Sequence, residues 1–394
     1  MLASIKNNQL LRSAFTVSKG DKLLPDNPRA IVREVFWNMN TTQSKIAEQT
    51  QIPQQTVSRL VKGLIEQGVL RVNEEKEESS TATKSSRGKS ASGIAPNPEF
   101  AYSFGLSVLL DAISVAVLDF TGEVVDTLIL ELDDMGIESV LRKAVAMANE
   151  WIETHAIPTD RILGMGVGIS GFFSSTDGKM NTHHAIEEWA DINIAETVAE
   201  AFQLPTWVVN DGTGTGAAAG EGIAGVGRQY KNFVYLFVSS AFGGGLVNNG
   251  DMIRGTHGNA GELGDMLPAK LYSHPNLQLL QRILSKHGVD VPSIYKLNET
   301  FDPNWPGVDE WIYKVQDSFD LVATASSVLL DGQAIIIGGH IPTQLAKKVI
   351  PRIDVYAQFR RGAKRPLPEI VCAEVTSSPV AVGAATLPLR EWFL

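Results

Sequence analysis

The sequence has almost no cysteine and no long apolar run. Cys372 is the single cysteine among 394 residues, which excludes an internal disulfide and any cysteine-rich zinc or iron–sulfur site. No stretch of about 18 apolar residues is present, so no membrane span is expected. The segment from Met1 to Arg12 lacks the apolar core of a secretory signal peptide. These absences together predict a cytoplasmic protein with no membrane attachment.

The charge of the chain is uneven. Hydrophobic residues make up 44% and charged residues 20%, a globular composition whose length fits two or three domains. The net charge of −10 argues by itself against a nucleic-acid binder, but residues 1–95 hold 14 basic and 9 acidic side chains. A basic head on an acidic body is typical of a DNA-binding domain joined to a ligand-binding domain. Chance variation over 95 residues is the alternative.

A polar segment separates the head from the body. Residues 74–92 read EEKEESSTATKSSRGKSAS and contain no aromatic or large aliphatic side chain. Such a segment cannot build a core, which predicts a flexible hairpin or linker. After Pro96 and Pro98 the chain becomes apolar and rich in β-formers. We therefore expect a first domain over 1–95, with a basic wing or linker at 74–95.

The head has the pattern of a winged helix-turn-helix. A first helix is predicted from Pro28 to Asn40, and a second from about 42 to 50 with Thr41 as its N-cap. A third begins with Pro53 at its first position and ends at Gly68, before a short strand at 69–72. The apolar stripe of the third helix consists of Val57, Leu60, Val61, Leu64 and Ile65.

The polar side of the third helix carries residue types that read DNA bases. Glutamine and arginine there can make bidentate contacts to adenine and guanine in the major groove. A basic loop beside the helix would reach phosphates or the minor groove. The predicted DNA contacts are Gln54, Gln55, Thr56, Ser58, Arg59 and Lys62 on the helix, and Lys84, Arg87 and Lys89 on the loop. A small helical bundle with a solvated polar face is the alternative.

The body reads as two similar α/β halves. Strands with tight turns are predicted over 103–130, followed by a helix at 137–155 and a buried strand at 162–169. A helix at 194–202, a strand at 206–209 and a Gly/Ala-rich helix from 214 to 221 follow. A second three-strand meander spans 233–255, a buried strand spans 334–337, and Gly383 opens a last helix. Two such lobes bind ligands at the carboxyl ends of their strands.

Three segments of the body resemble the ROK family (repressor, open reading frame, kinase). The most specific is GGGLVNNGDMIRGTHGNAGELGDM at 243–266, supported by GISG at 168–171 and VND at 209–211. The resemblance covers about residues 28–385 and implies a two-lobed actin-like, sugar-kinase and RNase H-like body. Together with the head it points to the transcription-regulator branch. The implied lobes are 96–210 and 211–394, with the chain end able to pack back on the first lobe.

The resemblance also shows what a ROK kinase has and this chain lacks. The family's phosphate hairpin, Asp-x-Gly-Gly-Thr-Lys, corresponds to Ser107-Val108-Leu109-Leu110-Asp111-Ala112. Two leucines replace the glycines, and Asp111 places a negative charge where a phosphate would lie. The family's second phosphate contact, Gly-Thr-Gly, is Ser239-Ser240-Ala241 here. We therefore expect no catalysis and no cofactor.

Sugar contacts are implied by the resemblance at the remaining cleft positions. Asp211 matches the family's general base and, without ATP, would hydrogen-bond a sugar hydroxyl or cap the following helix. Glu262 matches the family's sugar-binding glutamate, with a surface turn as the alternative reading. The full predicted set is Ser170, Gly171, His184, Asn210, Asp211, Gly244, Glu262 and Asp265. For the pair His183-His184, sugar contact and an inert surface position are the two alternatives.

The zinc site of the family is absent from the sequence. Its histidine position is Asp265, and the following stretch contains no cysteine, so no metal is expected. The sequence thus predicts a sugar-responsive transcription regulator, most simply a repressor, that binds operator DNA as a homodimer or homotetramer. A ROK sugar kinase with an added head, or a regulator controlled by a protein partner, are the alternatives.

Overall fold

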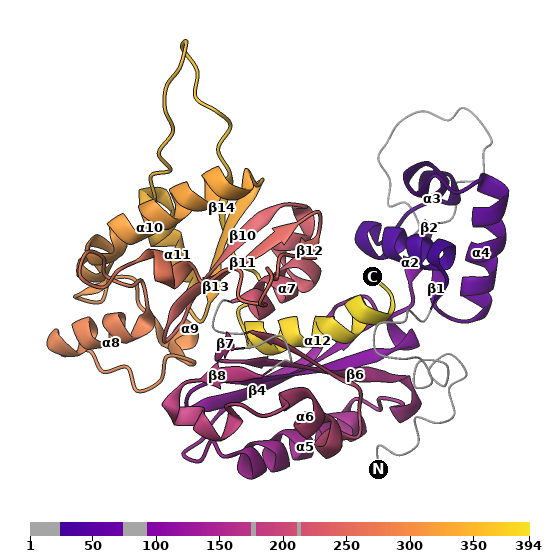
Figure 1. Ribbon diagram of the computed structural model, residues 1–394, viewed down its shortest axis with the longest axis horizontal. Helices are drawn as coiled ribbons and strands as arrows, with labels where there is room; N and C mark the ends of the chain where they lie inside the picture. The colour runs from indigo at the N-terminus through magenta and orange to yellow at the C-terminus, as the bar shows by residue number, and fades with distance from the viewer. Residues whose placement is uncertain (1–23, 74–92, 175–178, 211–213) are drawn as a thin grey trace.

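The computed structural model describes residues 24–73, 93–174, 179–210 and 214–394, with Asn210 described by its backbone alone. Three parts follow one another along the chain (Figure 1): a helical head, a lower α/β lobe and an upper α/β lobe. Within the described residues no helix combines the length and the apolarity needed to cross a membrane. The mixed α/β class and the two-lobed body are confirmed.

The head is a helix-turn-helix followed by a two-stranded sheet. Its helices are α2 (Asp26–Asn38), α3 (Gln43–Thr50) and α4 (Gln54–Glu66), and its strands are β1 (Leu70–Asn73) and β2 (Gly93–Pro96). Two predicted caps are wrong by one residue. Thr42 caps α3 by accepting the Lys45 N–H, because Thr41 is paired with Ile94 in a β-bridge. Pro53 is the N-cap of α4 and not its first residue.

The antiparallel pair β1–β2 gives the head its wing. Leu70 lies opposite Pro96 and Asn73 opposite Gly93, and the loop that joins the strands falls outside the described residues. The α4 stripe is inward as predicted: Val57, Val61 and Leu64 are buried, and Leu60 and Ile65 are half-buried. Gly68 follows α4 at φ +75°, a backbone conformation that suits glycine.

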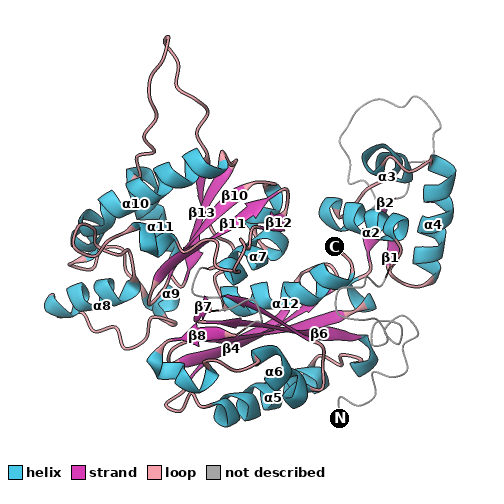
Figure 2. Ribbon diagram, viewed as in Figure 1, coloured by secondary structure: helices cyan, strands magenta, loops and turns pink. Residues whose placement is uncertain are grey.

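The first lobe is a five-stranded sheet in the order β5-β4-β3-β6-β9. Its strands are β3 (Tyr102–Val108), β4 (Ala112–Asp119), β5 (Val124–Glu131), β6 (Ile162–Ile169) and β9 (Thr206–Asn210). The first three are antiparallel, while β6 and β9 are parallel to β3. Helices α5 (Ile137–Thr154) and α6 (Ile194–Phe202) cover one face (Figure 2), and a hairpin of β7 (Gly171–Phe173) and β8 (Met180–Thr182) leaves the end of β6.

The second lobe repeats this topology, with sheet order β12-β11-β10-β13-β14. Its strands are β10 (Phe233–Val238), β11 (Phe242–Asn248), β12 (Asp251–Met252), β13 (Ala334–Gly339) and β14 (Glu369–Cys372). Around it lie α7 (Thr215–Ala224), α8 (Leu277–Lys286), α9 (Leu297–Thr300), α10 (Val308–Leu330) and α11 (Thr343–Val349). The matching order of the two sheets confirms the predicted pair of similar lobes.

The last helix, α12 (Pro379–Trp392), lies on the first-lobe sheet and against α7 (Figure 1). It begins four residues before the predicted start, and Gly383 lies in its interior. A Cβ at Gly383 would stand 1.6 Å from the carbonyl oxygen of Gly216 on α7, so glycine permits the two helices to touch. Gly105 and Gly166 allow the same close approach between the sheet and α12.

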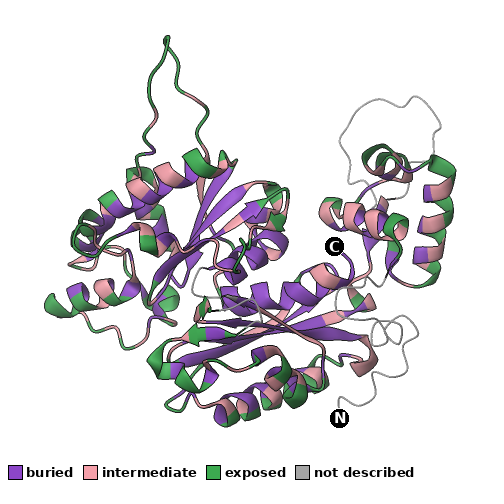
Figure 3. Ribbon diagram, viewed as in Figure 1, coloured by how far each residue is buried: buried purple, intermediate pink, exposed green. Residues whose placement is uncertain are grey.

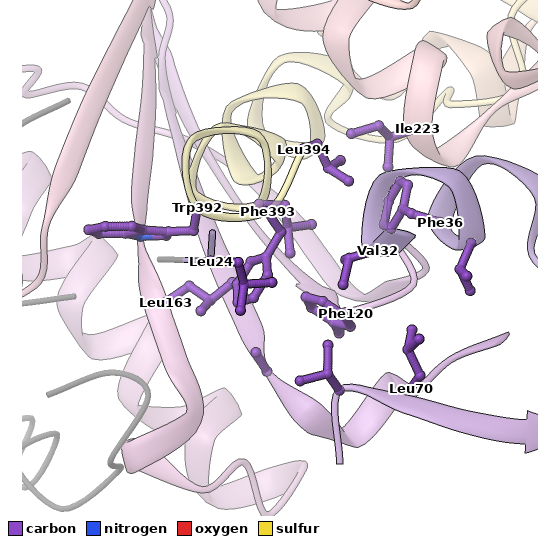
Figure 4. Packing of buried hydrophobic residues seen from close by; sticks show 14 of the residues in the cluster. Leu24, Val32, Phe36, Leu70, Phe120, Leu163, Ile223, Trp392, Phe393 and Leu394 are labelled. Atoms are coloured by element: carbon purple, nitrogen blue, oxygen red, sulfur yellow. The ribbon is translucent and has the colours of Figure 1, made fainter. Parts of the chain in front are cut away.

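The head and the body share one hydrophobic cluster. Figure 4 shows Val32 and Phe36 of α2 packed near Phe120 of the first lobe and the chain end, Trp392 to Leu394. Ile223 of α7 joins the same cluster. Phe120 and Phe393 stack edge to face with ring centroids 4.9 Å apart. The head is therefore held on the body by a packed apolar contact. A movement of the body can pass to the head through this contact.

Candidate functional site

The polar face of α4 is open to solvent. Gln54, Gln55, Ser58, Arg59 and Lys62 are exposed, and Thr56 is half-buried. This exposure follows from the apolar stripe, which turns the opposite side outward. Ser58 donates to the Gln43 side chain of α3, and Lys62 lies 3.8 Å from Glu66 on its own helix. Glutamine and arginine side chains on one exposed helix face can make bidentate contacts with base edges in a major groove. The predicted contacts Arg87 and Lys89 lie outside the described residues, as does Lys84.

The first group of predicted sugar contacts lies at the carboxyl end of β6. Ser170 follows β6 directly and donates its backbone N–H to Val108 of β3. Gly171 opens β7, and a Cβ there would meet the Asn181 carbonyl of β8 at 2.5 Å, so glycine is needed to form this hairpin. The two predicted residues therefore lie together, next to the turn that joins β3 to β4.

The second group lies on and beside the loop at 253–262, which joins β12 to the 3₁₀ turn η6 (Leu263–Met266). Glu262 is the residue that precedes η6 and is half-buried. Gly244 of β11 donates its N–H to Gly261 at 3.0 Å, and a Cβ at Gly244 would clash with Leu263. Gly244 thus lets the Glu262 loop lie flat on β11. Asp265 is exposed on η6, one turn after Glu262.

The remaining predicted sugar contacts are less fully described. Asp211 lies outside the described residues, and Asn210 is placed at the end of β9 by its backbone only. His183 and His184 are exposed where η4 (His184–Trp189) begins, and their rings meet at a tilt of 40° with centroids 3.9 Å apart. The His183 ring accepts the Ala185 N–H and so caps this turn. The carboxyl ends of β6 and β9 are adjacent, since Ile169 lies opposite Asn210.

The turn that resembles the family's first phosphate hairpin holds a contact between the lobes. The turn after β3 contains Leu109, which is buried, and Asp111, which is exposed. The hydroxyl of Tyr295, from the second lobe, donates to the Asp111 carboxylate. A carboxylate with a tyrosine against it repels a phosphate and fills the space near the turn. Tyr295 was not singled out from the sequence, because nothing local marks its partner 184 positions away.

The segment that resembles the family's second phosphate contact holds another internal contact. Ser239, at the end of β10, is buried, and its hydroxyl lies 2.7 Å from His340 Nδ1. Burial lowers the pKa of His340 to about 4, so the ring is neutral near pH 7. The Tyr295 ring meets the His340 ring edge to face at a centroid distance of 5.0 Å. Asp111, Tyr295, His340 and Ser239 therefore form one chain of contacts, which links the two turns that hold phosphates in a ROK kinase.

A second contact between the lobes lies beside the sugar positions. The Asn259 side chain accepts the Phe173 N–H at 2.8 Å and donates to the Phe173 carbonyl at 2.9 Å. Gly258, at φ +82°, packs under the Phe173 ring, where a Cβ would stand 2.6 Å away. Asn259 thus ties the Glu262 loop to β7 of the first lobe.

The same loop begins at the contact with the head. Arg33 of α2 donates to Asp251 of β12 at 2.9 Å. Arg390 of α12 donates to the Gly250 carbonyl at 3.0 Å and lies over the Trp37 ring. Beside this junction a cavity of about 780 Å³ opens between α2, α3 and the second lobe. The β11–β12 turn therefore connects the loop at 253–262 to the head.

Arg228 connects all three parts of the molecule. It lies in the 3₁₀ turn η5 (Val226–Gln229), before β10. Its guanidinium donates to the carbonyls of Phe36 in the head, Thr121 in the first lobe and Ile223 in α7. The Phe36 carbonyl belongs to the last turn of α2, where it has no partner within the helix. A cation at this carboxyl end of α2 also interacts favourably with the negative end of the helix dipole.

The described residues hold no group of three or more histidine, cysteine, aspartate or glutamate side chains able to bind a metal ion. Cys372, the one cysteine, lies at the end of β14 and is half-buried, and burial raises the pKa of its thiol. Asp265, at the position of the family's histidine, faces solvent. The loop that carries Glu262 is instead held by Asn259 and by backbone hydrogen bonds to β11.

Comparison with known proteins agrees with this architecture. Residues 105–278 match the family model described as ROK family. The chain is 22% identical to the DNA-binding transcriptional dual regulator NagC of Escherichia coli K12 over 92% of both chains. It is 23% identical to the xylose repressor of Bacillus subtilis, where the match covers 61% of this chain and 60% of that repressor.

Two solved structures match different shares of this chain. A ROK family transcriptional regulator, a homologue of the E. coli MLC protein, matches with a TM-score of 0.59 at 18% identity and covers 93% of this chain and 98% of its own. A ROK glucokinase from Streptomyces griseus matches with a TM-score of 0.58 at 19% identity and covers 73% of this chain and 99% of its own. The regulator match extends over more of this chain than the kinase match does. Residues 105–278 therefore match the ROK family model, and the fold over nearly the whole chain resembles that of a ROK transcriptional regulator.

Proposed function

We propose that this protein is a sugar-responsive, DNA-binding transcriptional repressor whose kinase-like body has lost catalysis. The repressor and regulator names of its relatives support this function. The exposed face of α4 supplies the DNA contact, and the cleft beside Glu262 supplies the sugar contact. The effector is a sugar or sugar derivative, and the regulated genes belong to carbohydrate use.

One observation carries the loss of catalysis. A ROK kinase must leave two turns free for nucleotide phosphates, and here both turns bind side chains of the protein itself. Asp111 accepts from Tyr295 on one side, and Ser239 pairs with the neutral ring of His340 on the other. Backbone N–H groups in a glycine turn are what normally hold a phosphate, and leucines occupy that turn. The same lobes are therefore suited to binding a sugar without transferring a phosphoryl group to it.

The contacts also supply a route from sugar to DNA. Sugar bound at Glu262 contacts the loop at 253–262. Asn259 ties this loop to the first lobe, and β12 directly precedes it. Asp251 of β12 binds Arg33 of the head. The cavity next to α2 leaves space for the head to shift. A differential effect of about 1–3 kcal/mol between the two head positions is enough for a 5- to 150-fold change in operator affinity.

The operator contact is tested first. A DNA library selected on the full-length protein supplies the operator, and titration then measures affinity. Arg59→Ala on α4 is expected to weaken binding by about 1–3 kcal/mol and to relax the sequence preference at one base position. Arg142→Ala removes an exposed arginine of α5 in the first lobe and serves as the matched control. Equal affinity of the two variants would show that α4 does not face the bases.

The sugar site and the loss of catalysis are tested together. Calorimetry with a panel of monosaccharides and phosphosugars is expected to find a ligand, and Glu262→Gln is expected to weaken it at least tenfold. A coupled ATP-dependent phosphorylation assay is run on the same sugars, with Asp211→Asn as the control. Turnover that disappears in the Asp211 variant would identify a kinase and overturn the proposal. Binding of no sugar at all would favour control by a protein partner.

A further inference from the structure

The cavity between the head and the second lobe has the size of a ligand site. It measures about 780 Å³, and pockets for small molecules usually measure about 300–1,000 Å³. Its walls come from α2 and α3 on one side, and from α7, η5 and the β11–β12 turn on the other. Figure 3 shows exposed residues on α3, where Lys45, Glu48 and Gln49 line the cavity and leave it open to solvent. None of its described lining residues is a predicted sugar or DNA contact.

More basic than acidic side chains line this cavity. The basic residues are Arg33, Lys45, Arg228 and Lys231, and the acidic ones are Glu34 and Glu48. Arg33 is already paired with Asp251. Burial raises the pKa of the Glu34 carboxyl, so its charged form is disfavoured there. The unpaired positive charge therefore belongs to Lys45 on the head and to Arg228 and Lys231 on the second lobe.

Two guanidinium groups at the cavity lack a carboxylate partner. Among the described residues, Nε of Arg228 and both Nε and Nη2 of Arg390 are buried without a hydrogen-bond partner. The nearby carboxylates of Asp251 and Glu391 lie against Arg33 and Arg254 instead. Burial lowers the pKa of Arg390 to about 10. Buried polar atoms without a partner are rare, and a bound ion is one of the ways in which proteins stabilise such charges.

The guanidinium of Arg390 lies directly behind the cavity wall. It lies 5.9 Å from the centroid of the Trp37 ring and donates to the Gly250 carbonyl at 3.0 Å, and both of these residues line the cavity. Gly222 is a third lining residue, and a Cβ there would stand 3.7 Å from Arg390 Nη2. Arg390 therefore adds positive potential to the floor of the cavity without filling it.

We propose that this cavity binds a phosphate group, either free or carried by a small metabolite, as a second effector site. A phosphate ester carries a charge of about −1.5 to −2 at pH 7 and three strong acceptor oxygens, which suit cations on opposite walls. Trp37 and Tyr230 supply apolar surface for an organic body. A phosphate held between Lys45 and Lys231 joins α3 to the second lobe and stabilises the docked head. Binding needs neither sugar nor operator, so it is tested independently of the proposed function.

Calorimetry of the full-length protein at constant ionic strength tests the site directly. Inorganic phosphate and glycerol 3-phosphate are the probes, and acetate is expected to bind at least tenfold more weakly because it carries a single charge. Lys45→Gln with Lys231→Gln is expected to weaken binding of both phosphates at least tenfold. Lys270→Gln with Lys286→Gln removes two exposed lysines that do not line the cavity, and is the matched control with unchanged binding.

Hydrogen exchange tests whether the phosphate stabilises the docked head. A ligand that binds only the docked head shifts docking about tenfold when present at ten times its dissociation constant. Amide protection in α2 and α3 is therefore expected to rise about tenfold, while protection in β6 stays unchanged. The variant that lacks Lys45 and Lys231 is expected to show no rise at the same phosphate concentration.

The results separate this site from other sources of binding. Equal phosphate binding by the two double variants would place the anion elsewhere, the sugar cleft included, and would overturn the proposal. No binding of either phosphate, a response that follows ionic strength alone, or equal binding of acetate would overturn it as well. Tighter binding of glycerol 3-phosphate than of inorganic phosphate supports a phosphorylated metabolite as the ligand, and equal binding supports the free ion.

Discussion

Replacing Arg228 by methionine is expected to loosen the head from the body without unfolding either. The variant keeps much of the aliphatic bulk but loses the donor to the Phe36 carbonyl and the charge that lies 5.1 Å from the Phe36 ring centroid. A hydrogen bond from a charged donor contributes about 1.5–3 kcal/mol, and a cation over a ring about 0.5–1 kcal/mol.

The burial of Arg228 reduces this gain. Burial lowers the pKa of its guanidinium, and its Nε is buried without a hydrogen-bond partner in the described structure. The desolvation cost that this implies is about 1 kcal/mol or more. The net contribution of Arg228 to head docking is therefore about 2 kcal/mol, which corresponds to about 30-fold in the equilibrium between docked and released head.

Hydrogen exchange of the α2 amides measures this equilibrium without any ligand. Protection over residues 26–38 is expected to fall about 30-fold in Arg228→Met, while amides of β6 in the first lobe keep their protection. Arg352→Met is the matched control, because that guanidinium binds Asp309 in the second lobe. Unchanged protection of α2 would refute the idea that Arg228 holds the head. Where a sugar response is measurable, the same variant is expected to lose most of it.

Three further results are expected from denaturant unfolding. Because His340 has a pKa of about 4 in the folded chain and about 6.5 when unfolded, the unfolded state binds a proton first, so the free energy of unfolding falls as pH drops from 6.5 towards 4. Relative to His340→Gln, the loss by pH 4.5 is about 2–3 kcal/mol, and parallel pH profiles would contradict it. Gly383→Ala is expected to lower the free energy of unfolding by about 3 kcal/mol, because the new methyl group overlaps α7. Gly63→Ala on α4 is the control, since a Cβ there has nothing within 4 Å, and it is expected to raise the free energy of unfolding by about 0.5–1 kcal/mol. Tyr295→Phe and Asp111→Asn are expected to show a coupling of about 0.5–1 kcal/mol in a double-mutant cycle, and additive effects would exclude the bond between the lobes.

Local sequence pattern predicted most of the regular elements. The helix at 194–202 and the strand at 162–169 were located to the residue, because a strong apolar period is bounded there by clear turn residues. The start of α12 was missed because Gly383 looks like a helix boundary in the sequence. Only the touching backbones of α7 and α12 explain a glycine inside that helix.

The site residues show the same difference between local pattern and contacts of distant segments. The resemblance to the family implied that both phosphate turns lack their glycines here, since such a difference is visible within six residues. It did not reveal what replaced the phosphate. Tyr295 and His340 lie far along the chain from Asp111 and Ser239, and side-chain pairs at such separation leave no local pattern.

The α/β lobes, the inward stripe of α4 and the polar face opposite it could be predicted from local pattern, because periodicity and turn chemistry act over a few neighbouring residues. The way the parts are joined could not be predicted in this way. The Arg228 bridge, the Asn259 tie between the lobes and the Tyr295–Asp111 contact each depend on groups brought together by packing of distant segments. Contacts of this kind are set by the fold of the whole chain, so no local pattern in the sequence marks them.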